Sequence, residues 1–154
     1  MAQTLPGLQA IAERINTGTD NTDTSRALTV FNLTRHSQSG IAVFRASMSW
    51  PRDVLLSPVV ITDTDGGMVP SAVREMTQGA DAKGRADRVQ LSFAIYFMVT
   101  DVPANGWRTY IASYTDAPSP GLENAPPNAD LVVMETTRHG GELPLVGELP
   151  LPVR

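Results

Sequence analysis

The feature of the sequence that most constrains the fold is a strict two-residue alternation of apolar side chains within residues 88–100. Successive side chains of a β-strand point to opposite sides, so apolar residues at every second position would all lie on one face. The polar and small residues between them would lie on the other face. The pattern therefore predicts a long strand with one buried face. Its inward residues are Val89, Leu91, Phe93, Ile95, Phe97 and Val99.

The same period of two recurs in other stretches after Arg26. Turn-forming sequences separate these stretches, and Asp63 to Gly67 would join two of them as a hairpin. A parallel sheet requires long crossover connections, and no helical pattern separates the strands here. The sequence thus predicts an antiparallel β-sandwich. The expected strands are residues 27–34, 41–50, 54–62, 68–76, 88–100, 107–114 and 131–134.

The two ends of the chain follow other patterns. Leu8, Ile11 and Ile15 recur at helical spacing, so residues 5–16 predict one short amphipathic helix. A polar linker follows, and the last part of the chain holds two copies of Gly-Glu-Leu-Pro-Leu, for which we expect an extended conformation. We therefore expect an all-β protein in which helix and linker occupy residues 1–26, an antiparallel β-sandwich residues 27–136, and a Pro-containing extended tail residues 137–154.

Composition excludes several classes of function. The net charge is −4 and basic residues form no stripe, so we expect no nucleic-acid partner. No window is apolar for the roughly 18–20 residues that a membrane span needs, and the first residues lack the pattern of a signal peptide. Cysteine is absent, which removes thiol chemistry. We expect a cytoplasmic protein without a membrane partner.

Neither catalytic residues nor metal ligands can be assigned from the sequence. The two histidines, His36 and His139, lie in polar stretches without a second ligand type at helical or hairpin spacing. Asp63 and Asp65 resemble the start of a calcium loop, but Gly67 and Arg74 stand where such a loop needs ligands, so a turn is the better interpretation. We expect no cofactor. Asn32 begins a glycosylation sequon, which matters only in a secretory compartment.

Three aromatic residues are the candidates for a ligand site. Trp50, Trp107 and Tyr110 could form a platform on which a sugar stacks, because their rings combine a flat apolar face with a polar edge. The alternative is that they belong to the core, and Trp50 shares the face of Phe44 on its strand. The sequence favours the core without excluding the platform.

A string of short motifs resembles a known family. Val30-Phe31-Asn32, Thr62-Asp63-Thr64-Asp65-Gly66, Val69-Pro70-Ser71 and Gly106-Trp107-Arg108-Thr109-Tyr110 are similar, in this order, to the start of the β-sandwich that follows the catalytic part of glycoside hydrolase family 38 α-mannosidases. The resemblance covers about residues 6–114. Two positions depart from it: Leu33 stands where the family has Pro, and Ala72 where it has Gln.

The resemblance implies a non-catalytic, accessory module. In that family the zinc ion and the aspartate nucleophile belong to the preceding catalytic domain, which nothing in this chain matches. The implied partner is a catalytic α-mannosidase domain or chain, docked on the helix face of Leu8, Ile11 and Ile15, or a second copy through self-association. One alternative is a stand-alone carbohydrate-binding module that uses Trp50, Trp107 and Tyr110. Another is a small hydrolase, for which the sequence shows no catalytic residues.

Overall fold

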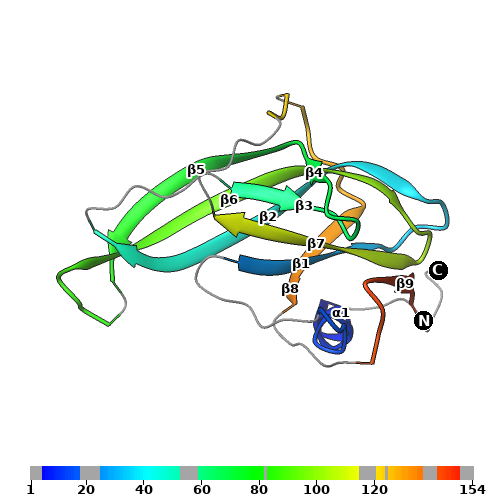
Figure 1. The fold of residues 1–154 in the computed structure, drawn as a ribbon, viewed down its shortest axis with the longest axis horizontal. Coiled ribbons are helices and arrows are strands. Elements are labelled where there is room, and N and C mark those ends of the chain that lie inside the picture. Colours follow the sequence, from blue (N-terminus) through cyan, green and yellow to red (C-terminus); the bar gives the residue numbers. More distant parts are fainter. Residues whose placement is uncertain are drawn as a thin grey trace.

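The structure is a computed structural model that describes residues 5–17, 25–52, 59–81, 83–114, 121–123, 125–136 and 142–149. Within them the chain forms two antiparallel sheets packed face to face, with one helix (Figure 1). The all-β sandwich predicted from the sequence is thereby confirmed. The elements are α1 (Leu5–Ala12), β1 (Ser25–Asn32), β2 (Gln38–Pro51), β3 (Val59–Thr62), β4 (Met68–Val69), β5 (Ser71–Ala80), β6 (Arg88–Val102), β7 (Gly106–Tyr114), β8 (Leu131–Thr136) and β9 (Val146–Glu148).

The larger sheet has the strand order β4-β3-β7-β1-β8, and β9 adds to β7 on the same edge as β3. The smaller sheet has the order β2-β6-β5. An apolar core fills the space between the sheets, and a second apolar cluster lies under the helix and the tail, on the outer side of the larger sheet. Residues 27–32 of β1 are consequently buried on both faces.

The predicted long strand is the centre of the smaller sheet. β6 pairs with β2 along one edge and with β5 along the other, and its six predicted inward residues are all buried. Phe97 meets Tyr110 of the facing sheet edge-on, with ring centroids 5.6 Å apart. This geometry is the preferred one for aromatic pairs, and it joins the two sheets at the middle of the core.

The helix is shorter than predicted and packs on its own sandwich. α1 ends at Ala12 rather than near residue 16, because the next turn tightens and Ile15 then forms a parallel bridge with Leu143 of the tail. Leu8 and Ile15 are fully buried against the larger sheet. The apolar helix face expected to receive a partner is therefore already covered by the chain itself.

A second difference concerns the hairpin expected from residues 54–62 and 68–76. Only Met68 and Val69 pair back with β3, at Thr62 and Ile61. Pro70 then interrupts the pairing, because proline has no backbone donor for a sheet. After it the chain crosses to the smaller sheet, where β5 pairs with β6. The turn residues were correctly interpreted, but they join a very short hairpin to a strand of the other sheet.

Phe97 offers a direct test of the core. Replacing Phe97 by Ala should lower the free energy of unfolding by roughly 3–5 kcal/mol, because the fully buried ring leaves a cavity between the sheets. Urea unfolding measures the loss. Met76→Ala is the matched control, since the Met76 side chain is 48% exposed and its removal should change stability by less than about 0.5 kcal/mol. Equal effects of the two substitutions would contradict the arrangement of the sheets.

Candidate functional site

The three aromatic residues considered for sugar binding lie in the interior and do not share a surface. Trp50 is 9% exposed and Tyr110 is 1% exposed, and both belong to the core between the sheets. Trp107 is 2% exposed and lies in the cluster on the other side of the larger sheet. Positions 107 and 110 of β7 point to opposite faces of the sheet. In these positions the rings support packing, and they form no common platform for a ligand.

Each buried polar group of Tyr110 and Trp107 has a specific partner. The hydroxyl of Tyr110 accepts from the backbone N–H of Thr100 at 3.4 Å, and burial raises the pKa of the Tyr110 phenol. The indole N–H of Trp107 donates to the Pro144 carbonyl at 3.0 Å. Tyrosine and tryptophan in protein interiors normally find such partners. The bonds hold these two rings in place within the fold.

The groups considered for metal or acid–base chemistry do not converge among the described residues. His36 is exposed and its imidazole lies near no acidic cluster that could hold a metal, while His139 lies outside the described residues. Asp63 organises its own turn, since its Oδ1 accepts from the backbone N–H groups of Asp65 (2.9 Å) and Gly67 (3.0 Å). The interpretation of this motif as a turn is confirmed.

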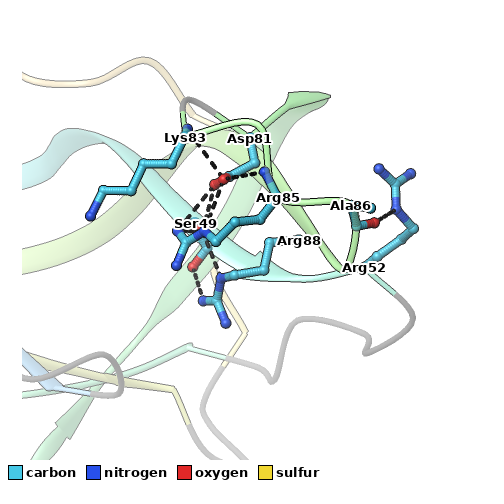
Figure 2. A network of polar contacts seen from close by, with 7 residues as sticks. All are labelled: Ser49, Arg52, Asp81, Lys83, Arg85, Ala86 and Arg88. Carbon is cyan, nitrogen blue, oxygen red and sulfur yellow. Dashed lines mark hydrogen bonds and ion pairs between the residues drawn. The ribbon is translucent and has the colours of Figure 1, made fainter.

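The most strongly bonded acid is Asp81, around which the loop between β5 and β6 is organised (Figure 2). Its Oδ2 accepts from the backbone N–H groups of Lys83 at 3.2 Å and Arg85 at 3.1 Å. The guanidinium of Arg85 donates to both carboxylate oxygens, at 3.0 and 3.3 Å. The hydroxyl of Ser49 donates to Oδ1 at 2.9 Å, and only 1% of the Asp81 side chain is exposed.

Ser49 connects this loop to the two neighbouring strands. Its hydroxyl oxygen accepts from Nη2 of Arg85 at 3.1 Å and from Nε of Arg88 at 2.7 Å, while its O–H donates to Asp81. A hydroxyl has one donor and two acceptor positions, so all three are used. Arg88 also donates to the Ser49 carbonyl at 2.9 Å. Figure 2 shows the guanidinium of Arg85 against Asp81 and Ser49 and that of Arg88 against Ser49. These contacts link the ends of β2 and β6 to the loop.

The electrostatics of this network identify a structural role. Hydrogen bonds from the Arg85 guanidinium hold the pKa of the Asp81 carboxyl far below its usual value, although burial acts in the opposite direction. The pKa of Arg85 is raised in turn by the hydrogen bond to Asp81. A carboxylate that stays ionised near neutral pH and whose oxygens are occupied by donors is poorly suited to general acid or base catalysis. The network stabilises the fold.

Asn32 is a second polar anchor, which the sequence places in a glycosylation sequon and in the Phe-Asn motif of the family resemblance. Its side chain is fully buried, and its amide donates to the carbonyls of His36 (2.8 Å), Val102 (3.1 Å) and Pro103 (3.1 Å). Its Oδ1 accepts from the N–H and the hydroxyl of Thr34. Asn32, the residue shared by the Phe-Asn motif and the sequon, thus connects the end of β1 to the turn between β6 and β7.

One small cavity lies on the outer side of the smaller sheet. Its volume is about 200 Å³, and its described lining is mostly apolar. Glu123 is the one acidic residue in that lining, and Gly121 beside it forms a parallel bridge with Ser71. The described part of the lining includes no pair of acids and no histidine. Its described lining residues are Ile41, Pro70, Met98, Gly121, Leu122, Glu123 and Ala125.

The fold of the chain is similar to part of each of two larger proteins. No protein-family model matches the chain, and no curated protein matches it in sequence. Its structure is similar to a glycosyl hydrolase family 38 protein from Enterococcus faecalis, with a TM-score of 0.54 and 11% identity over 78% of this chain and 16% of that one. It is also similar to an α-mannosidase from Enterococcus faecalis V583, with a TM-score of 0.51 and 12% identity over 78% of this chain and 15% of that one.

These similarities confirm the predicted resemblance as one of fold. The chain spans about a sixth of the length of each of the two proteins. At this level of identity the shared property is the arrangement of the strands, and no catalytic or binding residue is transferred by it. None of the described segments forms a helix with the length and apolarity needed to cross a bilayer.

The Asp81 network predicts a particular response to acid. Because the folded-state pKa of Asp81 lies below its ordinary 3.8, the ionised carboxylate stabilises the fold above about pH 4, and this contribution is lost as the pH falls toward the folded-state value. Asp81→Asn should therefore lower the urea midpoint at pH 7. The urea midpoints of the variant and the unsubstituted chain should approach each other below pH 4. Asp65→Asn, at an exposed acid, is the control and should show no such trend. A difference that does not vary with pH would contradict the ion pair.

The hydrogen bonds of Asn32 predict that two substitutions at this position will lower stability by different amounts. Asn32→Ala removes the side-chain donor from the carbonyls of Val102 and Pro103, while the His36 carbonyl keeps the Thr34 hydroxyl, and it should cost roughly 1–3 kcal/mol of unfolding free energy. Asn32→Asp should cost more at neutral pH, because it places a carboxylate, which cannot donate, against the same carbonyls. Urea unfolding of both variants measures the order. A milder effect of Asp than of Ala would show that the donor bonds are not what holds this residue.

Proposed function

We propose that this chain is a non-catalytic β-sandwich module that supports carbohydrate hydrolysis by a neighbouring catalytic domain or chain of the α-mannosidase type. The observation that carries the proposal is the fold shared with two family 38 proteins, of which this chain spans about a sixth. The mechanism is structural: the module presents a rigid sandwich to the catalytic part and takes no chemical step itself.

The residues that carry the sequence resemblance support this role. Asn32 ties β1 to a turn, Asp63 closes its own turn, and Trp107 and Tyr110 lie in the two apolar clusters. All of these side chains stabilise the fold through turn hydrogen bonds or core packing. The resemblance is thus one of scaffold positions, as expected for a supporting module.

Docking on a catalytic partner must use a surface other than the apolar face of α1. That face is covered by the larger sheet and by the tail. One part of the outer face of the smaller sheet differs, because polar side chains there are linked to one another across the strands. Examples are the ion pair of Arg45 with Glu75 at 3.1 Å and the bond from Gln90 to Ser47 at 2.6 Å. Such a face suits a polar interface between domains.

The stand-alone carbohydrate-binding module receives no support from the aromatic residues that suggested it. Trp50, Trp107 and Tyr110 would have to leave the interior to stack on a sugar. We keep the cytoplasm as the proposed location. The sequon at Asn32 gives no reason to expect a secretory compartment, because the amide is buried and already bonded.

Two measurements test the proposal. The purified chain, with and without added zinc, should show no turnover of an aryl α-mannoside. The product of the adjacent reading frame, if it encodes a family 38 catalytic portion, should co-purify with the chain and gain activity or stability from it. Turnover by the chain alone that is lost on further purification to homogeneity is a contaminant, and turnover that persists would overturn the non-catalytic assignment.

A further inference from the structure

The tail carries a strand pattern that sequence reasoning did not use. In residues 143–149, Leu-Pro-Leu-Val-Gly-Glu-Leu, every second residue is Leu or Gly. Leu143 and Leu145 pack against the apolar cluster around Trp107, and Leu149 is buried in it. The residues between them, Pro144, Val146 and Glu148, are exposed or half-buried. This is the alternation of a strand that lies on an apolar surface.

Backbone bonds hold the whole segment along the edge of β7 and beside the helix. β9 pairs with Gly106, Trp107 and Arg108, and the register continues on both sides. The N–H of Thr109 donates to the Leu145 carbonyl at 2.9 Å, and the N–H of Leu149 donates to the Asn105 carbonyl at 2.7 Å. These bonds use main-chain groups, so they are available to any extended segment of suitable side chains.

Trp107 selects the side chain at one position. A Cβ built on Gly147 would lie 2.7 Å from Cζ2 of Trp107, closer than real Cβ contacts, and a Cβ on Gly106 would lie 2.3 Å from the Gly147 carbonyl oxygen. The indole N–H meanwhile donates to the Pro144 carbonyl at 3.0 Å. The ring therefore favours segments with two features: a free carbonyl at position 144 and no side chain at position 147.

We propose that the edge of β7 and Trp107 form a peptide-binding groove for an extended Leu-x-Leu-x-Gly-x-Leu segment, occupied in this structure by the chain's own residues 143–149. The groove has the parts of a strand-addition site: an edge with main-chain donors and acceptors, an apolar surface for alternate side chains, and a steric filter at Trp107. This inference goes beyond the proposed function, because it assigns a binding activity for a second peptide of the same pattern.

The chain's own segment determines when a free peptide can enter. A segment tethered in the same chain acts at an effective concentration of the order of millimolar, so free peptide competes poorly with it. A substitution that weakens the tethered segment, and leaves the groove unchanged, should open the site. Gly147→Val is such a substitution, since it adds a side chain against Trp107 in a strand where valine is otherwise favourable.

The experiment measures binding of a fluorescent peptide with the sequence of residues 141–151 to the full chain. By fluorescence anisotropy, the Gly147→Val chain should bind this peptide at least tenfold more tightly than the unsubstituted chain does. The same peptide carrying Val in place of Gly147 should bind the Gly147→Val chain at least tenfold more weakly. Gly79→Val is the matched control chain, because a Cβ there meets nothing within 4 Å, and it should behave as the unsubstituted chain.

Each result decides the proposal. Failure of a folded Gly147→Val chain to bind the peptide better than the unsubstituted chain would overturn it, as would equal binding of the Gly and Val peptides. If circular dichroism shows that the Gly147→Val chain does not fold, the Gly147→Ala chain, which also places a Cβ 2.7 Å from Trp107, is titrated with the same peptides. Saturable binding that the Val peptide lacks then supports the groove, and the lack of saturable binding refutes it. None of these results depends on the presence of a catalytic partner.

Discussion

The burial of the larger sheet on both faces is the constraint on which the rest of the structure depends. Residues 27–32 of β1 have apolar or bonded polar contacts on either side, because the smaller sheet covers one face and α1 with the tail covers the other. A sheet of this kind needs an apolar layer on each side to remove its surface from water. The helix and the tail are therefore parts of the fold, and the isolated two-sheet body would expose Phe31 and Trp107.

The sequence predicted those parts of the fold in which one short-range pattern repeats over many residues. The alternation from Val89 to Val99 identified β6 because all of its alternate apolar side chains lie on the same buried face. The turn at Asp63 was predictable because the carboxylate bonds to amides two and four residues ahead. The order of such strands and turns was also enough to indicate the family whose fold the chain shares.

The polar networks that were missed include partners far away in the sequence. Asp81 accepts a hydrogen bond from the hydroxyl of Ser49, and the Asn32 amide donates to the Val102 carbonyl. Neither pairing can be recognised from the neighbouring sequence. The end of α1 is set by the bridge between Ile15 and Leu143, and the crossing of β5 into the smaller sheet follows from its pairing with β6. The aromatic residues were ambiguous for the same reason, since strand position alone does not say what covers a face.

The covering of Trp107 has a consequence for biosynthesis. Residues 142–149 leave the ribosome after strands β1 to β8, so the outer apolar layer stays open while these strands assemble. During that interval the indole and its neighbours are exposed to chaperones and to other nascent chains. Slow translation of the codons after Thr136 would lengthen this interval and so prolong the exposure of the indole.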